Sequence, residues 1–256
     1  MSLKISGINV NGIRSACTKG LVTWLKETSP DIVCIQELKA QDHDIPDEIK
    51  DLGYQAFYHA AEKKGYSGVA ILSNRSPLDV EIGIGTEWVD AEGRLLVLHF
   101  KDWSICSIYA PSGTTGEVRQ HMKYVFLDLF ESYIKTQQEK GRKLIFVGDF
   151  NIAHQEADIH NPKGNKNSSG FLPEERAWFT KFLQLGYVDV FRHLNPSITD
   201  VYSWWSFRAN SRNNNKGWRI DYQIADSDLI SYLKEAYIET EVILSDHAPV
   251  TAIYDL

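Results

Sequence analysis

The chain has 256 residues, 43% of them hydrophobic, and a formal net charge of −7. A membrane-spanning helix needs about 18 apolar residues in a row, and no run in this chain approaches that length. We therefore expect no membrane partner. Three cysteines without metal-type spacing, and a start that lacks the layout of a signal peptide, predict a cytoplasmic protein. Cys34 and Cys106 lie inside apolar runs and are predicted to be small core residues.

The acidic balance argues against a nucleic-acid partner, but two loop-like stretches with basic residues contain no Asp or Glu. Residues 159–173 carry His160, Lys163 and Lys166 among small polar residues. The second stretch, residues 203–220, carries four basic residues and four aromatic residues: Arg208, Arg212, Lys216, Arg219, Trp204, Trp205, Phe207 and Trp218. Each stretch is either a local phosphate-binding surface or a solvated loop. The aromatic content favours the first interpretation for residues 203–220 and leaves both open for residues 159–173.

Short apolar runs alternate with polar connections along the whole chain. In chain order, they predict a strand over 3–10, a helix over 21–27, a strand over 31–36, a helix over 45–52, strands over 54–59, 68–73, 80–84, 94–100 and 103–109, a helix over 116–140, a strand over 144–147, a helix over 174–185, a strand over 220–225, a helix over 229–233, and strands over 235–239 and 249–254.

Two local patterns sharpen this prediction. Lys101 and Asp102, between two strand-like runs, fit a tight hairpin. The longest helix has apolar side chains spaced for one buried face: Val118, Met122, Phe126, Leu129 and Tyr133.

The order of strands and helices predicts the fold class. Many strands in adjacent pairs, with helices before and between them, indicate an α/β four-layer sandwich, in which two packed mixed β-sheets are flanked by helices. The sequence contains no linker, low-complexity run or fixed repeat. We therefore expect residues 1–256 to form a single domain.

The most informative stretch is residues 144–151, an apolar strand that ends in Gly148, Asp149, Phe150 and Asn151. Because strand side chains alternate in direction, Asp149 and Asn151 point to the same side and Phe150 points to the core. A carboxylate and an amide placed in this way can hold a water and a phosphate oxygen. Taken alone, the same residues also fit a turn that closes a strand.

Other predicted strands end in the same manner. The polar residues at these ends are Asn9 and Asn11, Glu37, Tyr109, Asp149 and Asn151, Asp221, and Asp246 with His247. Each one alone fits a turn, a helix cap or a surface position. Gathered together, the carboxylates would repel one another unless a hard divalent cation such as magnesium bound them. The neighbouring His247 supplies a base or an orienting group, or is a hydrogen-bonded core residue.

Several motifs together resemble the exonuclease III family of apurinic/apyrimidinic endonucleases, within the endonuclease/exonuclease/phosphatase superfamily. The matching blocks lie in family order between Asn9 and Pro249: residues 36–39, 65–69, 148–151, 161–166, 170–176, 217–222 and 245–249. The resemblance therefore covers essentially the whole chain. It implies cleavage of the DNA backbone on the 5′ side of an abasic site, leaving a 3′-hydroxyl and a 5′-deoxyribose phosphate, with 3′-exonuclease and 3′-phosphodiesterase activity in varying proportion.

The resemblance also implies roles for particular residues. Glu37 is the principal magnesium ligand, and manganese may replace the ion; the other residues implied at the metal are Asn9, Asp149, Asn151 and Asp246. Asp149 activates the attacking water and Asn151 positions the water or the phosphate. His247, oriented by Asp221, contacts the scissile phosphate, and Tyr109 hydrogen-bonds it near the leaving oxygen. Whether Asp149 or His247 is the base stays open.

Substrate choice is expected in the aromatic loop. Trp204, Trp218 and Ile220 match the family's hydrophobic pocket for an extrahelical sugar, which excludes a nucleotide that carries a base. The alternative is that the two tryptophans are ordinary core residues. The residues expected to contact DNA are Asn11, Arg14, Lys39 and Arg208, with Lys216 and the lysines at 163 and 166. The expected partner is double-stranded DNA with abasic sites or damaged 3′ ends, bound by a monomer.

Three alternative functions are weighed against this interpretation. One is a mainly 3′-5′ exonuclease or 3′-end-cleaning enzyme. Another is a phosphodiesterase for substrates other than DNA, which should lack the residues 204–220 series and the residues 161–176 block. The third is a non-catalytic DNA-binding module, which should have lost Glu37, Asp149 or His247. All of these features are present in the chain, so a DNA-repair nuclease is favoured.

Overall fold

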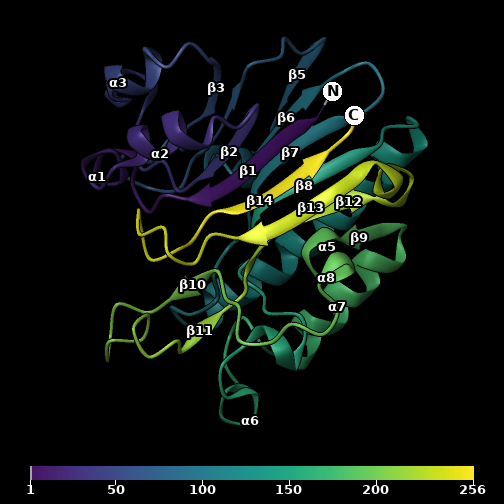
Figure 1. Cartoon of the computed structure of the whole chain (residues 1–256). Helices are drawn as coiled ribbons and strands as arrows, with labels where there is room; N and C mark the ends of the chain where they lie inside the picture. The colour runs from purple at the N-terminus through teal and green to yellow at the C-terminus, as the bar shows by residue number, and fades with distance from the viewer. Residues whose placement is uncertain (1) are drawn as a thin grey trace.

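The computed structural model describes residues 2–256 and contains two six-stranded sheets (Figure 1). The first sheet has the order β13 (Leu233–Ile238), β14 (Val250–Tyr254), β1 (Leu3–Asn9), β2 (Ile32–Gln36), β4 (Val69–Ser73) and β3 (Gln55–His59). The second has the order β5 (Asp79–Ile82), β6 (Leu95–His99), β7 (Ser104–Tyr109), β8 (Leu144–Asp149), β12 (Asp221–Asp226) and β9 (Tyr187–Asp189). Each sheet is mixed, because β1 and β2 run parallel in one, and β7 and β8 in the other.

The helices lie outside the two sheets. Their bounds are α1 (Ile13–Thr18), α2 (Leu21–Thr28), α3 (Asp47–Lys50), α4 (Glu87–Ala91), α5 (Glu117–Glu139), α6 (Pro162–Asn165), α7 (Pro173–Gln184) and α8 (Val190–Leu194). Three 3-10 turns, η1 (Asp42–Asp44), η2 (Glu156–Asp158) and η3 (Ser227–Tyr232), join these elements. Within the described residues, no helix combines the length and the apolar character that a membrane crossing requires.

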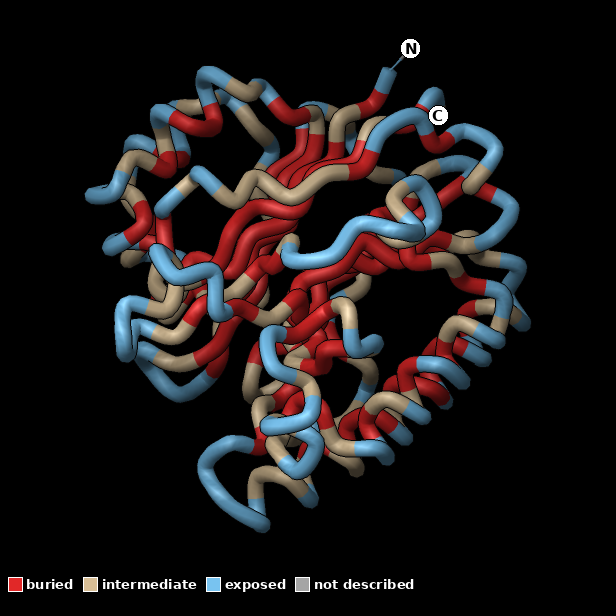
Figure 2. The backbone as a smooth tube through the Cα atoms, turned by 60° about the horizontal axis from the view of Figure 1, so that its bottom comes forward, coloured by how far each residue is buried: buried red, intermediate tan, exposed pale blue. Residues whose placement is uncertain are grey.

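Three apolar layers hold the sandwich together, and the predicted four-layer α/β fold is confirmed. Leu3, Ile32 and Cys34 of the first sheet meet Ile105 and Val147 of the second in the central layer. The other face of the first sheet packs on α1, α2 and α3, and the other face of the second packs on α5 and α7. Figure 2 shows the buried sheets between helices whose outer faces are exposed. Burying an aliphatic or aromatic side chain stabilises by about 1.5–3 kcal/mol, so these layers dominate the folding free energy.

The two sheets approach each other closely near the ends of β1 and β8. A Cβ atom at Gly7 would lie 2.3 Å from Val147 Cγ1, so only glycine fits there. Beside it, buried Gln36 Nε2 donates to Ser107 Oγ at 3.0 Å and to the Val147 carbonyl at 3.3 Å. These buried polar contacts fix the two sheets relative to each other directly beneath the polar strand ends.

Most predicted elements are present, and the differences have local causes. The hairpin at Lys101 and Asp102 is confirmed, with His99 paired to Ser104. Val118 was predicted on the buried face of the long helix, and this is wrong: it is 76% exposed, because the first turn of α5 extends beyond the sheet that buries Phe126. The predicted helix over 229–233 is the 3-10 helix η3.

The sequence pattern missed several short elements, besides the 3-10 turns η1 and η2. These are α1, α4, α6, α8, strand β9 and the two-stranded hairpin of β10 (Trp204–Trp205) and β11 (Gly217–Trp218). Each spans two to six residues. Such lengths are too short to show a hydrophobic period, and tertiary packing decides their conformation.

Glu81 on β5 allows a test of how the edge of the second sheet is stabilised. It accepts hydrogen bonds from His99 Nε2 at 3.1 Å, Gln137 Nε2 at 3.0 Å and Arg142 Nη1 at 2.6 Å. Although burial opposes ionisation, the hydrogen bonds from His99 and Arg142 lower the pKa of Glu81 to about 2. A lowered carboxyl pKa stabilises the fold fully above pH 4.5, and that stabilisation is lost as the pH falls toward 2.

We expect Glu81→Gln to lower the free energy of unfolding at pH 7 by about 1 kcal/mol, and by less as the pH falls toward 2. Urea unfolding at pH 7, 4 and 2.5 measures this, with the exposed Glu87→Gln as the control. A difference between Glu81→Gln and wild type that stays constant over this pH range would contradict the role of the Glu81 carboxylate.

Candidate active site

The polar strand ends meet at one edge of the sandwich because of strand direction. β1 and β2 run parallel, so Asn9 ends one strand beside Gln36, which Glu37 follows. β7 and β8 also run parallel, which places Tyr109 beside Asp149. β12 is antiparallel to β8, so its first residue, Asp221, pairs with Asp149. Residues far apart in the chain are thereby brought to one place.

Unusual backbone conformations mark this edge. Gly148 has a φ of 151°, and a Cβ atom there would lie 2.0 Å from the Ile108 carbonyl oxygen. Asn11, Glu37, Lys39 and Asn151 all have φ between 46° and 53°. Residues other than glycine adopt the left-handed region only where the surroundings enforce it, and such residues cluster at functional sites.

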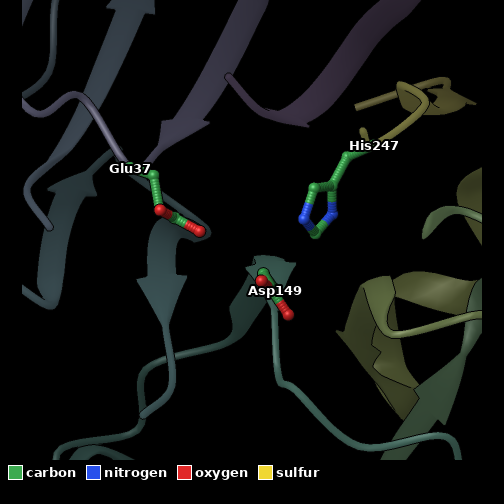
Figure 3. A group of neighbouring side chains, drawn as sticks. All are labelled: Glu37, Asp149 and His247. Carbon is green, nitrogen blue, oxygen red and sulfur yellow. The ribbon is translucent and has the colours of Figure 1, made fainter. Parts of the chain in front are cut away.

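Three ionisable side chains converge at this edge and could hold a metal ion. Glu37, Asp149 and His247 each offer a donor atom, and these atoms all lie within 4.8 Å of one another. Figure 3 shows Glu37 and His247 facing each other, with Asp149 between them. Asn9 Nδ2 donates to Glu37 Oε1 at 2.9 Å and to Asp149 Oδ2 at 3.0 Å, so it bridges the two carboxylates.

This donor set fits a hard divalent cation. Oxygen atoms dominate it, and a third carboxylate, that of Asp246, lies on the lining of the same cavity. Asp246 itself accepts hydrogen bonds from Asn11 Nδ2 at 2.9 Å and from Trp204 Nε1 at 3.0 Å. The amide oxygen of Asn9 accepts from the backbone N–H of Asn11 at 3.0 Å. The roles predicted for Asn9 and Asp246 as ligands therefore stay predictions.

His247 is held by a buried carboxylate. Its Nδ1 lies 2.8 Å from Asp221 Oδ2, which leaves Nε2 for the cavity. Ser203 Oγ donates to the same oxygen of Asp221 at 2.7 Å and accepts from the Asp221 backbone N–H at 3.0 Å. Although burial lowers the pKa of His247, the Asp221 carboxylate raises it to about 10. The raised pKa favours the protonated imidazole, in which Nε2 carries a proton and can donate a hydrogen bond into the cavity.

Asp149 has the opposite environment. It is 1% exposed, and burial together with the nearby Asp221 carboxylate raises its pKa to about 8. The Asn151 backbone N–H donates to Asp149 Oδ1 at 2.7 Å, while Asn151 Nδ2 donates to the Ala110 carbonyl at 2.9 Å. Asp149 and Asn151 thus face the same side. Perturbed carboxyl groups of this kind in a cavity are candidates for proton transfer.

Glu37 and Tyr109 complete the polar floor of the site. Burial raises the pKa of Glu37, but the Lys39 ammonium, 2.8 Å from Glu37 Oε2, lowers it below its usual value. Burial and the Glu37 carboxylate raise the pKa of Tyr109 well above its usual value, so its hydroxyl stays protonated. Arg94, which is buried, lies over the Tyr109 ring at 4.9 Å and donates to the Tyr109 carbonyl at 2.8 Å.

These groups line a cavity of about 540 Å³ that also has an apolar wall. Trp204 and Trp218 are half-buried, with ring centroids 6.1 Å apart at an angle of 89°, and Ile220 lies with them. The interpretation that both tryptophans are core residues is only partly right: they pack on Ala153, Ile159 and Phe171, yet they also line the cavity.

The structure gathers most of the predicted site residues. Those that line the cavity are Glu37, Tyr109, Asp149, Asn151, Trp204, Trp218, Ile220, Asp246 and His247. Asn9 and Asp221 lie directly behind them, and Lys39 and Asn11 are connected to Glu37 and Asp246 by hydrogen bonds. Arg14 and Arg208 are exposed and lie outside this lining, so only their predicted contact with DNA could connect them to the site.

Part of the lining has no role predicted from the sequence. Its small residues are Ser112, Gly113, Thr114, Gly116, Ser168, Ser169 and Gly170. Ser203 and Arg94, which hold Asp221 and Tyr109, were not predicted either. The cluster of glycine and hydroxyl residues after Pro111 was the available indication for the first group. Nothing in the sequence pairs Ser203 with Asp221, because only the hairpin of β10 and β11 brings them together.

A buried carboxylate and histidine group at the ends of a two-sheet sandwich defines a metal-dependent hydrolase. The chain belongs to the Endonuclease/Exonuclease/phosphatase family, whose model matches residues 8–247. This confirms the family resemblance that the motifs indicated.

Characterised relatives agree with this assignment. The chain is 41% identical over 255 residues to an exodeoxyribonuclease of Bacillus subtilis, covering 99% of this chain and 100% of that protein. It is 38% identical over 253 residues to the DNA repair nuclease APEX1 of Danio rerio, covering 98% and 81%. The structure of an AP endonuclease from Archaeoglobus fulgidus superimposes with a TM-score of 0.90 at 30% identity, covering 99% and 100%.

Glu37 provides a test of the metal-ligand group that does not depend on activity. We expect Glu37→Ala to weaken the binding of a divalent cation by about 10- to 100-fold or more, because it removes a carboxylate from the three converging groups. Titration of Mn²⁺ followed by electron paramagnetic resonance measures the affinity. The exposed Glu62→Ala is the control, and equal affinities for both variants would remove Glu37 from the metal site.

Proposed function

We propose that this protein is a magnesium-dependent DNA-repair nuclease that incises the backbone on the 5′ side of an abasic site. The observation that carries the proposal is that one cavity combines the Glu37, Asp149 and His247 group with the wall formed by Trp204 and Trp218. The first group suits hydrolysis of a phosphodiester, and the second suits a sugar that has lost its base. The relatives named as an exodeoxyribonuclease, a DNA repair nuclease and an AP endonuclease support the same function.

Glu37 and Asp149 would hold the ion, with Asp246 and Asn151 at the rim. Magnesium fits because the donors are mainly oxygen and the substrate is a phosphate; manganese has similar preferences. When bound, the ion supplies charge stabilisation for the pentacovalent phosphate and the leaving oxygen. The net charge of −7 is then compensated locally where phosphate must enter.

Asp149 is proposed as the base. Burial and the nearby Asp221 carboxylate raise its pKa, which gives Asp149 a higher affinity for a proton than an exposed aspartate has. Asn151, on the same side, would orient the attacking water or a phosphate oxygen. As the water oxygen bonds to phosphorus, its proton passes to Asp149, the bond from phosphorus to the 3′ oxygen breaks, and the released 3′ oxygen takes up a proton from solvent. The products are a 3′-hydroxyl and a 5′-deoxyribose phosphate.

His247 and Tyr109 are proposed to bind the phosphate. His247 is cationic and held by Asp221, so its Nε2 can donate to a non-bridging oxygen as charge develops. Tyr109 keeps its proton and can donate near the leaving oxygen. This division supports Asp149 over His247 as the base, which the sequence left open.

The aromatic wall would select the lesion. Trp218 and Trp204 meet edge to face, and Ile220 closes the space behind them. A deoxyribose without a base can enter, and extrusion from the duplex costs least where base pairing is already lost. Asn11, Arg14, Lys39 and Arg208 are proposed to contact the DNA around the cavity.

A second candidate function is mainly 3′-5′ exonuclease or 3′-end cleaning activity, favoured by the name of the Bacillus subtilis relative. Both activities use the same hydrolytic group, so the balance between them is a property of how the DNA binds. A labelled duplex with one internal tetrahydrofuran site, incubated with Mg²⁺ or with EDTA, separates them. One metal-dependent cut on the 5′ side supports the proposal, and stepwise shortening from the 3′ end without an internal cut supports the alternative.

Asp149→Asn should reduce cleavage of that duplex by several orders of magnitude and leave DNA affinity within a few-fold, because the amide cannot take the proton of the water. Single-turnover cleavage and fluorescence anisotropy measure the two quantities. Asp102→Asn, on the exposed hairpin, serves as the control. An Asp149→Asn variant with wild-type turnover would exclude Asp149 as the base.

Trp218→Ala should reduce the preference for abasic over intact duplex by on the order of tenfold, since it removes one wall of the sugar pocket. The ratio of kcat/KM for the two substrates measures this preference, and Trp218→Phe should keep most of it. If Trp218→Ala keeps the full preference, Trp218 is a packing residue only.

A further inference from the structure

A buried ion pair lies directly behind the candidate site. Lys123 Nζ on α5 is 2.5 Å from Glu175 Oε1 on α7, and both side chains are 0% exposed. Taking two charges out of water costs several kcal/mol each, and a well-packed apolar pair often stabilises as much. The location of this pair is therefore better explained by what else the two side chains bind than by stability alone.

Lys123 also binds the turn that carries Asn151. Its Nζ donates to the Asn151 carbonyl at 2.8 Å. Asn151 has a φ of 53°, a conformation that a residue other than glycine keeps only when its surroundings hold it. The backbone N–H of the same residue binds Asp149. We call residues 149–151 the Asn151 turn. Lys123 thus holds the Asn151 end of this turn, and the proposed base, Asp149, lies at its other end.

Glu175 binds the segment that forms part of the cavity wall. Its Oε2 accepts from the backbone N–H of Gly170 at 2.6 Å and from that of Leu172 at 3.0 Å. We call residues 168–170, which line the cavity, the wall segment. Glu175 Oε1 accepts a further hydrogen bond from Gln120 Nε2 at 3.0 Å, so the carboxylate is well satisfied.

The turn and the wall segment also contact each other and the aromatic pocket. The Ala153 N–H donates to the Gly170 carbonyl at 2.8 Å. The α-carbon of Gly170 is so close to its neighbours that an added Cβ would lie 3.0 Å from the Trp218 ring and 3.1 Å from the Asn151 carbonyl oxygen. A small shift of the wall segment would therefore move Trp218, Asn151 or both.

We infer that Lys123 and Glu175 are positioning residues that fix the Asn151 turn and the wall segment relative to each other, and so control turnover and lesion preference together. This inference rests on the proposed function, because it gives Asn151 and Trp218 the roles stated there. It goes beyond that function by coupling two parts of the cavity through residues that line neither.

A second ion-pair cluster between the same helices serves as a matched control. Glu131 on α5 pairs with Lys181 on α7 at 2.9 Å and with Lys135 at 2.6 Å. This cluster joins α5 to α7, as the pair of Lys123 and Glu175 does, but none of its residues lines the cavity. Glu131→Gln therefore reports the effect of weakening the helix contact alone.

The experiment compares Lys123→Met/Glu175→Gln with Glu131→Gln and the wild type. The double variant leaves no unpaired buried charge, so it should fold even where a single variant does not. We measure kcat and KM on abasic and intact duplexes, and amide hydrogen exchange of residues 168–172. For the double variant we expect kcat to fall about tenfold or more with little change in KM, a smaller abasic preference and faster exchange at Gly170 and Leu172. Glu131→Gln should change none of these.

A folded double variant with wild-type kcat, preference and exchange would overturn the inference. An equal loss in Glu131→Gln would also overturn it, because the effect would then belong to helix packing. Failure of the wild type to cut the abasic duplex would count against the proposed function instead. Amide exchange would then still decide whether the pair holds the wall segment.

Discussion

The crowding of carboxylates at one buried edge is the constraint on which the rest of the structure depends. β8 and β12 are paired so that Asp149 lies opposite Asp221, and Glu37 arrives beside them from the other sheet. Like charges at this proximity repel, and burial strengthens the repulsion. Asn9 bridges two of the carboxylates, and His247 with Ser203 neutralises and binds the third. The chemistry proposed for the site follows from this balance, since burial and the repulsion from Asp221, which raise the pKa of Asp149, also favour the binding of a divalent cation.

The sequence predicted the strands that form regular apolar runs, and the polar residues that directly follow those runs. Buried strands such as β2 and β8 show continuous apolar runs, and the polar residues that follow them stand out for that reason. Strand direction then brings the ends together, so Glu37, Asp149 and His247 could be predicted to meet without knowledge of any distance. Family motifs added the aromatic wall.

Other features have no local trace in the sequence. The left-handed conformations of Glu37 and Asn151 are imposed by tertiary contacts. The same holds for the hairpin that carries Trp204, in which β10 and β11 have only two residues each. Arg94, Ser203 and Lys123 act through partners distant in the chain, with Arg94 reaching Tyr109 and Lys123 reaching Asn151. A basic residue within a helix is normally predicted to be exposed to solvent, so the sequence did not predict the burial of Lys123. The exposure of Val118 has the same origin, because helical spacing does not show where the covering sheet ends.

The position of β14 has a consequence for how the protein is made. β1 lies between β2 and β14, with Leu3 paired to Tyr254, so one of its two neighbours follows it in the chain only after about 250 residues. Until β14 has left the ribosome, β1 keeps an unpaired edge, and Asn9 at its end is not held firmly across the two sheets. Pairing between strands so far apart in the chain forms slowly, because the entropy of the long intervening chain must be lost first. The catalytic centre, which needs Asn9 at the end of β1 and His247 just before β14, is therefore assembled only when this long-range pairing closes the fold.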